Sequence, residues 1–428
     1  MRSAKSQGQT RKEGGSAQRV IQRISALAKI SEEPGRLTRT FCSHAMRKAH
    51  KLFGSWMRNA GMKVRVDAIG NLIGHYGAKE TNRDKGKVLL IGSHLDTVRN
   101  AGKFDGPLGV LSGIACVENL KRQNIRFPFA IEVVGFADEE GVRYHTTYLG
   151  SRVLAGTFDD KDLKRVDAKG ISMADAIRGF GGNPGWLAHA KLNSKQLLAY
   201  VEVHIEQGPV LEQKNLAVGV VTGIAGQTRA HYSFSGRAGH AGTTPMSLRK
   251  DALCAAAEFV LGVESYARSR SGLVATVGEL NVESAASNVI PGSVTLSVDV
   301  RHANDAARAK ACAKIHALAR QIGLKRGVTV QKKPVQQTKA VACDPSLISL
   351  LNKSVHKHQP QTLLLPSGAG HDAAAMAAVA PVAMLFVRCK HGISHHPAES
   401  ASTKDIQVAI SVMNNFLQLC GEHFVGAA

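Results

Sequence analysis

Short apolar runs alternate with helically spaced apolar residues over the first half of the chain. The runs at 88–91 and 129–136 are typical of buried strands, and apolar residues within 110–120 are spaced four, three and three apart, as on one helix face. Strands that alternate with helices in this way predict an α/β layered sheet. We therefore expect α/β structure over residues 20–215.

The pattern changes in the middle of the chain. Over 294–300, apolar residues alternate strictly with polar ones, which is typical of a strand with one exposed face. Helical spacing recurs around 249–268 and 304–322. Two helices with about four such strands predict a small α+β domain over 216–333, with its helices on one face of a sheet.

The α/β pattern resumes after Pro334, with a helix expected over 373–380 and a strand over 382–387. The simplest organisation is one α/β domain, built from 20–215 and 334–428 and interrupted by the inserted α+β domain. A chain of 428 residues is also too long for one ordinary core, so its length favours two domains.

The first twenty residues, MRSAKSQGQTRKEGGSAQRV, are basic, small and polar. They contain no apolar stretch of the kind that a secretory signal needs, and we expect a disordered basic tail over residues 1–19. A transit peptide is the alternative, but the stretch has no amphipathic period and carries Glu13. No apolar run reaches the ~20 residues that a membrane helix requires, so we expect a cytoplasmic protein without a membrane partner.

The seven cysteines are odd in number, widely scattered and without a CxxC pair. This pattern is typical of buried free thiols in a reducing compartment. It argues against both a zinc ribbon and a disulfide scaffold.

The formal net charge of +22 raises the question of a nucleic-acid partner. Lys and Arg are spread along the chain, however, and aromatic residues make up only 5%, without a basic-aromatic stripe. We therefore expect no nucleic acid, and we interpret the charge as favouring solubility and a small anionic substrate.

Polar clusters follow several of the expected strands. The stretch GSHLDTVRNAGKFDGPLG places His94, Asp96 and Asp105 directly after the run at 88–91. Alternation puts His94 and Asp96 on one side, so that Asp96 can hold the imidazole while the other ring nitrogen faces a metal. The next cluster, GFADEEG, places Glu139 and Glu140 after another apolar strand, where adjacent buried acids need a cation or a proton to offset their repulsion.

Two further clusters complete the set. YVEVHIEQG carries His204 on the polar face of a strand, and SHHPAE carries His395 just past another strand, with GAGHD shortly before it. Each cluster alone is also compatible with a solvated loop, an acidic helix start or a structural histidine. Together they supply imidazole and carboxylate ligands from separate strand ends, which predicts a site for two divalent metal ions bridged by a carboxylate.

The motifs HLD, FDGPLGV, DEEGVRY, HIEQGPVLE, GHAGTTPM and GISHHPAE, in this order and spacing, resemble the dinuclear-metal amidohydrolases of the aminoacylase and carboxypeptidase type. Within them, the chain is most similar to the branch of allantoate amidohydrolase, N-carbamoyl-L-amino-acid hydrolase and β-ureidopropionase. The resemblance covers nearly the whole chain from about residue 20. It implies an α/β fold, with a three-layer metallopeptidase-like catalytic domain and an inserted α+β domain that acts as lid and dimerisation domain.

The resemblance also implies roles for individual residues. Asp105 would bridge two divalent ions, Zn²⁺ or Mn²⁺, and Glu139 would be the general base. Asp96 would support His94. The remaining metal ligands would be His94 and His204 for one ion and Glu140 and His395 for the other.

The inserted domain would contribute His240, which in the family reaches the active site of the partner subunit and stabilises an oxyanion. A homodimer is therefore implied. Arg301 also has a rationale of its own, because a guanidinium binds a carboxylate through two hydrogen bonds. The substrate contacts implied by the family are Gln227, Asn288, Arg301, Gly370 and His371.

The implied reaction is metal-dependent hydrolysis of a ureido C–N bond, with release of ammonia and carbon dioxide. The flanking segments SEEPGRLTRTF and LFVRCKHGISHHPAES favour allantoate, and hence purine nitrogen recovery. N-carbamoyl-L-amino acids and β-ureidopropionate are the alternatives. An exopeptidase of the same fold and a binding protein that has lost activity are rival classes; His204 argues against the former, and the full ligand set with Glu139 argues against the latter.

Overall fold

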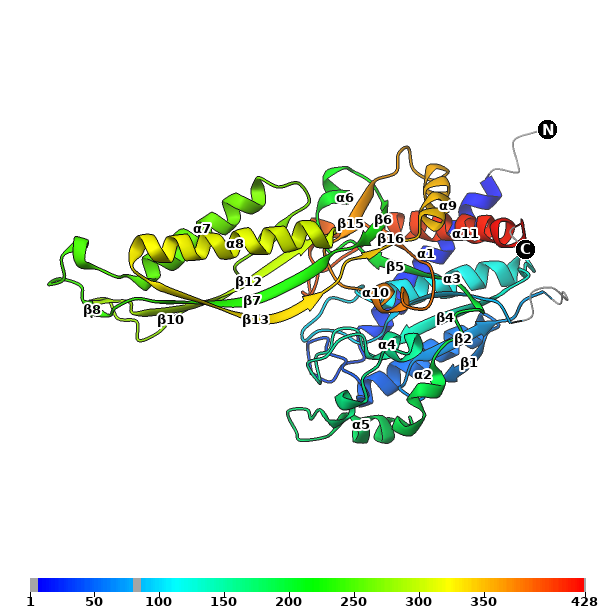
Figure 1. Ribbon diagram of the computed structural model, residues 1–428. Helices are drawn as coiled ribbons and strands as arrows, with labels where there is room; N and C mark the ends of the chain where they lie inside the picture. The colour runs from blue at the N-terminus through cyan, green and yellow to red at the C-terminus, as the bar shows by residue number, and fades with distance from the viewer. Residues whose placement is uncertain (1–6, 80–85, 427–428) are drawn as a thin grey trace. The chain divides into compact units, whose positions relative to one another are not determined.

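The computed structural model describes residues 7–79 and 86–426, which fold as two compact units (Figure 1). The first unit comprises Met1–Thr222, Cys343–Leu365 and Gly370–Ala428. The second comprises Gly223–Ala342 and Pro366–Ala369. The chain thus leaves the first unit, forms the second and returns.

The first unit is built on a large mixed sheet whose main path runs β1-β2-β4-β3-β5-β16-β6-β14, with β15 also paired to β6. Strands β3, β4, β5 and β16 are mutually parallel neighbours. Their carboxyl ends therefore lie at one edge of the sheet, which is where parallel sheets place their functional side chains. The strands are β1 (Lys63–Val66), β2 (Leu72–Tyr76), β3 (Val88–His94), β4 (Ala130–Phe136), β5 (Leu197–Ile205), β6 (Val218–Ile224), β14 (Val341–Ala342), β15 (Leu364–Ser367) and β16 (Val382–Val387).

Helices cover both faces of this sheet and make three layers. One buried apolar cluster joins one face to α1 (Gln7–Leu27), α2 (His44–Asn59), α3 (Pro107–Arg122), α9 (Pro345–His356) and α11 (Thr403–Gly426). A second cluster contains α4 (Leu149–Ala155), α5 (Met173–Phe180) and η2 (Pro184–Ala190), and α10 (Asp372–Met376) packs beside α4. Short segments complete the unit: η1 (Asp160–Lys164), α6 (Val210–Gln213) and η4 (Lys390–Gly392).

The helix α1 corrects the prediction of a disordered tail. Residues 7–19 belong to this helix, whereas residues 1–6 lie outside the described residues. Ala17, Val20, Ile24 and Leu27 are buried and recur at helical spacing. They pack in the same cluster as α3 and α11, so tertiary contacts stabilise a helix that the polar composition around it conceals.

The second unit is an antiparallel sheet with two helices on one face (Figure 1). The alternating apolar side chains of β12 are buried against these helices, as the sequence pattern predicts. Its sheet runs β10 (Leu280–Val282), β12 (Ser293–His302), β7 (Gly226–Ser235), β13 (Thr329–Thr338), with β9 (Val274–Thr276) also paired to β12. The helices are α7 (Ala252–Arg268) and α8 (Asp305–Arg326), and β8 (Gly239–His240), β11 (Val289–Ile290) and η3 (Met246–Leu248) form a small extension.

The second unit begins and ends a few residues later than the pattern indicated. Pro334 does not mark the return to α/β structure, because it lies inside β13, which continues to Thr338. The pairing of β13 with β7 shifts register between Pro334 and Gln336, and such an irregularity is where a strand tolerates proline.

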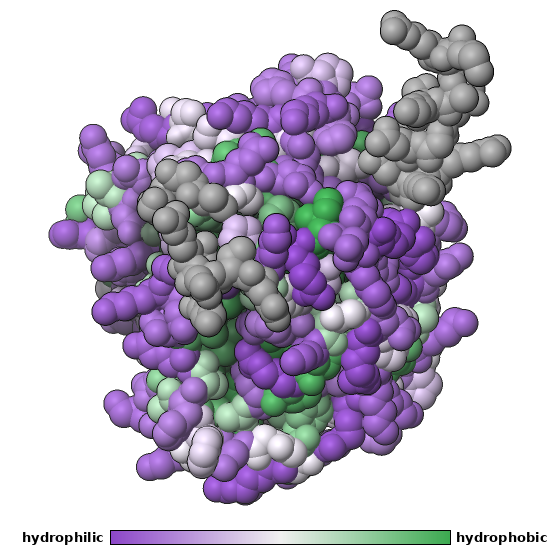
Figure 2. Space-filling view, turned by 90° about the vertical axis from the view of Figure 1, so that its right-hand side faces the viewer, coloured by the Kyte–Doolittle hydropathy of each residue, from purple (hydrophilic) through white to green (hydrophobic). Residues whose placement is uncertain are grey.

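Several features of the chain as a whole complete the description. The seven cysteines are all free, but only four of them are buried as predicted: Cys254 is exposed, and Cys42 and Cys312 are partly buried. Across the described residues, no helix combines the length and apolar character needed to cross a membrane. The face shown in Figure 2 is mostly hydrophilic with smaller hydrophobic areas, since most large apolar side chains lie in the buried clusters.

Candidate metal centre

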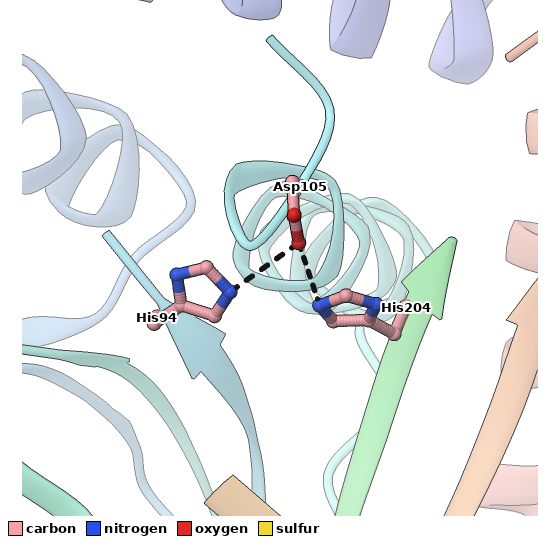
Figure 3. Close-up of side chains that lie close together, drawn as sticks. All are labelled: His94, Asp105 and His204. Carbon is pink, nitrogen blue, oxygen red and sulfur yellow. Dashed lines mark ion pairs between the residues drawn. The ribbon is translucent and has the colours of Figure 1, made fainter. Parts of the chain in front are cut away.

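The carboxyl edge of the large sheet brings two histidines to one carboxylate (Figure 3). His94 ends β3, His204 lies near the end of β5, and Asp105 lies in the loop before α3. The Nε2 atoms of His94 and His204 are 3.5 and 3.0 Å from Oδ1 of Asp105, and all three residues are buried. These side chains form one group whose donor atoms could hold a metal ion.

The second oxygen of Asp105 faces a different set of donors. Nε2 of His395 lies 3.2 Å from Oδ2 of Asp105 and 3.4 Å from Oε1 of Glu140. Asp105, Glu140 and His395 form a further group able to hold a metal ion. The Asp105 carboxylate therefore lies between the two donor sets, one oxygen facing each.

The orientation of the imidazole rings fits a metal. Nδ1 of His94 lies 3.0 Å from the backbone carbonyl of Asp96, and Nδ1 of His204 lies 2.9 Å from that of Ile205. A ring whose Nδ1–H donates to a carbonyl keeps a lone pair on Nε2. Two such lone pairs converge on Oδ1 of Asp105, which is buried without a hydrogen-bond partner among the described residues. A divalent cation satisfies all three atoms.

Buried acids concentrate negative charge at this edge. Burial, and next the charge of Asp105, raises the pKa of Glu140 to about 7. Burial, and next the charge of Glu140, raises the pKa of Glu139 well above its usual value. Burial acts in the same direction on Asp105, but the imidazoles of His204, His395 and His94 around its carboxylate outweigh burial and hold the pKa of Asp105 well below its usual value. A bound cation would offset the repulsion among these carboxylates.

Asp96 joins two of the strand ends. Its carboxylate accepts the backbone N–H of Glu139 at 2.9 Å and that of Glu140 at 3.1 Å. The same carboxylate lies 3.4 Å from Nδ1 of His94, farther than the Asp96 carbonyl. The sequence predicts only the contact with the imidazole; the anchoring of the Glu139–Glu140 backbone is visible only in the structure.

Glu399 is a functional residue to which sequence reasoning gave no role. Its buried carboxylate accepts the backbone N–H groups of Phe104 at 2.7 Å and Asp105 at 3.0 Å, and the hydroxyl of Ser394 at 3.1 Å. A Cβ at Gly102 would lie 2.3 Å from this carboxyl group, so the loop needs glycine there. The one available signal was its position as the final Glu of the SHHPAE motif.

Arg39 anchors the end of β3 from the opposite side. It is 1% exposed, and its Nε donates to the carbonyl of Leu95 at 2.8 Å. Its Nη1 donates to the carbonyls of Leu27 and Ile30, each at 3.3 Å. The segment that follows α1 is thereby tied to the strand end that carries His94.

The structure brings His371 to the edge of the centre. Its buried ring meets the His204 ring edge-on at a centroid distance of 4.5 Å. A Cβ on Gly370 would lie 1.8 Å from the Tyr148 hydroxyl, so no side chain fits there. Both residues were predicted as substrate contacts; in the structure His371 packs against His204, and Gly370 lies beside Tyr148.

The predicted residues of the second unit fall into two pairs. Gln227 and Arg301 face each other across β7 and β12, and both side chains donate to Asp299. His240 pairs with Val289 across β8 and β11. The preceding residue, Asn288, accepts the N–H of Ala241 through its backbone carbonyl at 2.9 Å. The structure thus brings together the members of each pair.

The two pairs lie at opposite ends of β12. Arg301 is near the carboxyl end of this strand, and the β8–β11 extension adjoins its start at Ser293. At about 3.3 Å per residue, the eight residues between Ser293 and Arg301 span roughly 26 Å. The structure therefore does not bring His240 and Arg301 of one chain together.

Comparisons with known proteins all indicate one family. Residues 90–419 match the model of the family described as "Peptidase family M20/M25/M40". An N-carbamoyl-L-amino acid amidohydrolase of Geobacillus stearothermophilus is 40% identical, over 92% of this chain and 96% of its own length. A probable allantoate deiminase of Oryza sativa subsp. japonica is also 40% identical, over 93% of this chain and 87% of its own length.

A solved structure supports the same family assignment. The crystal structure of an amidase of the hydantoinase/carbamoylase family from Burkholderia multivorans superposes with a TM-score of 0.87 at 32% identity, covering 94% of this chain and 97% of that one.

Proposed function

Because the chain belongs to peptidase family M20/M25/M40 and is a metal-dependent amidohydrolase of the allantoate deiminase and N-carbamoylase type, we propose that it hydrolyses a ureido C–N bond of allantoate. The relatives act on two kinds of ureido acid and are equally similar to this chain. Allantoate is favoured by the flanking segments SEEPGRLTRTF and LFVRCKHGISHHPAES. N-carbamoyl-L-amino acids are the second candidate, and β-ureidopropionate is the third.

The observation that carries the proposal is the Asp105 carboxylate between two donor sets. We propose that it bridges two divalent ions, Zn²⁺ or Mn²⁺, since both metals accept imidazole and carboxylate ligands. His94 and His204 would complete one site, and Glu140 and His395 the other. Bound ions of this kind polarise a carbonyl group and make a water nucleophile available at neutral pH.

Glu139 is proposed as the general base. It shares a group of donor atoms with His94 and Glu140, all within 4.8 Å of one another, so its carboxylate faces the metal centre. It accepts a proton from the attacking water and returns it to the leaving nitrogen. Water adds to the ureido carbonyl, the C–N bond breaks and ammonia leaves, and the remaining carbamate decomposes to an amine and carbon dioxide.

His240 is proposed to stabilise the oxyanion that forms on the ureido carbonyl. Its Nδ1 accepts the backbone N–H groups of Gly242 at 3.1 Å and Thr243 at 3.2 Å. The neutral ring then carries its proton on Nε2, which is the form that donates a hydrogen bond.

The separation of His240 from Arg301 along β12 supports a role for His240 in the partner subunit. Arg301 is proposed to bind the substrate carboxylate, with Gln227, Asn288, Gly370 and His371 as further substrate contacts. A small ureido acid cannot touch both ends of a strand of this length. We therefore propose a homodimer in which the inserted unit, Gly223–Ala342 with Pro366–Ala369, serves as lid and dimerisation domain, and the α/β unit is catalytic.

Ammonia release tests the proposal directly. The protein is loaded with Mn²⁺ or Zn²⁺ and assayed with allantoate, N-carbamoyl-L-amino acids and β-ureidopropionate side by side. We expect allantoate to give the highest kcat/KM. A preference for a carbamoyl amino acid would select the second candidate, and no release from any of the three would reject the proposal.

A further inference from the structure

We propose that Asp299 is a positioning residue for Arg301, which it holds so that one N–H on each terminal nitrogen of the guanidinium remains free to bind the substrate carboxylate. This inference rests on the carboxylate-binding role proposed above for Arg301. It identifies a residue whose effect on the reaction is confined to recognition of the carboxylate.

The hydrogen bonds of Arg301 leave a defined pair of donors. Nε and Nη2 donate to the two oxygens of Asp299 at 2.9 and 3.0 Å, and Nη1 donates to the carbonyl of Gly368 at 2.7 Å. A guanidinium has five N–H groups, and these bonds use one on each nitrogen. Among the described residues, these bonds leave one N–H on Nη1 and one on Nη2 without a partner. A carboxylate that binds both is held in a fixed orientation.

The sheet itself sets this arrangement. Asp299 and Arg301 are two residues apart on β12, so their side chains lie on the same face, away from the helices. Gln227 lies opposite Arg301 on β7 and donates to Asp299 as well. The carboxylate of Asp299 is thus also held by a donor from the neighbouring strand, β7.

A second arginine keeps the cluster positive. Nε of Arg229, which lies opposite Asp299 on β7, donates to the same carboxylate at 2.9 Å. Burial would raise the pKa of Asp299, but its bonds with Arg301 and Arg229 outweigh burial and lower that pKa. One carboxylate therefore faces two guanidinium groups. Arg301 is oriented by Asp299 without losing the positive charge that attracts an anion.

Space is present beside the cluster. Arg301, Asp299 and Arg229 line a cavity of about 650 Å³, which also includes the apolar side chains of Val274 and Val335. The side chain of Arg301 is 29% exposed, so it is partly shielded from water without being closed off. A charge-assisted hydrogen bond in such a setting is stronger than one on an open surface.

The first test compares Asp299→Asn with wild type on two substrates. One is the ureido acid that wild type prefers, and the other is the same compound with a carboxamide in place of the carboxylate. For Asp299→Asn we expect KM for the acid to rise on the order of 10- to 100-fold, the range of one charge-assisted hydrogen bond, with kcat changed by about 2-fold or less. KM for the carboxamide should stay the same, because the guanidinium contact that is weakened involves only the substrate carboxylate.

Glu258→Gln is the matched control. Glu258 bridges α7 and α8 through Arg326 and Lys325 in the same unit, and the substitution removes the same charge. It should leave both KM values at the wild-type level. If Asp299→Asn protein shows the same ratio of the KM values for acid and carboxamide as wild type, Asp299 is only an ion-pair partner of Arg301. That result would overturn the inference.

A measurement without turnover guards against folding effects. Isothermal titration of the ureido acid into Glu139→Gln protein, with and without Asp299→Asn, should show the same 10- to 100-fold loss of affinity. If Asp299→Asn fails to fold, Asp299→Glu replaces it: the charge is kept but the carboxylate is displaced by one methylene from the guanidinium, so KM for the acid alone should rise several-fold, and an unchanged ratio of the two KM values would overturn the inference. The proposed function fails separately, if wild type hydrolyses no ureido acid.

Discussion

The carboxylate of Asp96 accepts the backbone N–H of Glu139 at 2.9 Å, and this bond connects the end of β3 to the end of β4. The side chain of Asp96, two residues after the proposed ligand His94, thereby fixes the backbone of the proposed base. The two strand ends are therefore coupled, and a substitution at either end should alter the geometry of both.

We expect Glu139→Gln to lose turnover while keeping its metal. Gln retains the shape of the side chain but accepts no proton, so kcat should fall on the order of 10²- to 10⁴-fold. Metal content, measured by inductively coupled plasma mass spectrometry, should equal that of wild type because Glu139 is not among the proposed ligands. Retained activity would reject Glu139 as the base.

We expect His240→Ala to be inactive although folded. If His240 acts in the partner subunit, mixing this variant with Glu139→Gln protein should restore part of the activity, since mixed dimers contain one intact site. Subunit exchange is followed by native mass spectrometry with differently tagged chains. Full exchange without recovered activity would place His240 in its own subunit's site.

We expect Glu399→Ala to weaken metal binding. Its carboxylate fixes the backbone of Asp105, and loss of such support typically costs 10- to 100-fold in metal affinity. Asp344→Ala is the control, because Asp344 accepts the N–H groups of Ser346 and Leu347 at the start of α9 and belongs to none of the metal groups. The control should cost about 1 kcal/mol of stability and leave the metal dissociation constant unchanged. Equal affinities in both variants would count against a role for Glu399.

We expect Arg301→Ala to raise KM steeply for carboxylate substrates. The variant removes both free N–H groups at once, so the rise should exceed that of Asp299→Asn. An unchanged KM would remove Arg301 from substrate binding.

Stability should fall in acid because of His50. Burial, helped by the charges of Arg39 and Arg47, lowers the pKa of His50 from 6.5 to about 4. The unfolded chain then binds a proton between pH 6.5 and pH 4 that the folded chain does not, so this contribution is fully present above pH 6.5 and is lost as pH falls towards 4. The loss is on the order of 3 kcal/mol.

The measurement is the unfolding free energy of His50→Leu and wild type across this range. The variant should show a shallower decline in stability, whereas His423→Gln, at an exposed position, should decline as wild type does. Parallel curves for wild type and His50→Leu would exclude His50 as the cause.

The sequence predicted the fold class and the donor sets because both depend on local patterns. The strand over 382–387 has the predicted bounds, and the proposed ligand residues lie at or after the ends of strands that are parallel neighbours. Helix 373–380 is shorter than predicted and ends at Met376, since an alanine-rich run has the right propensity without a signal for its end.

The parts that could not be predicted depend on contacts between distant segments. Glu399 binds backbone groups almost 300 positions earlier in the chain, with a separation of 294 residues to Asp105. In the sequence, Asp299 is one polar residue on an exposed strand face, and its partners Arg229 and Gln227 are visible only once β7 is paired with β12. No periodicity along the chain encodes such partners.

The link made by Arg39 has a practical consequence for the N-terminal region. The composition of the first twenty residues suggests that they could be removed, yet Ala17 and Val20 are buried in the core. The carbonyl of Leu27 also accepts a hydrogen bond from Arg39, which binds the end of the strand that carries His94. Removing the residues before position 28 would take core side chains out of the α/β unit and would also weaken the support of the strand that carries His94. A segment that looks dispensable from its composition is therefore part of the structural support of the proposed metal centre.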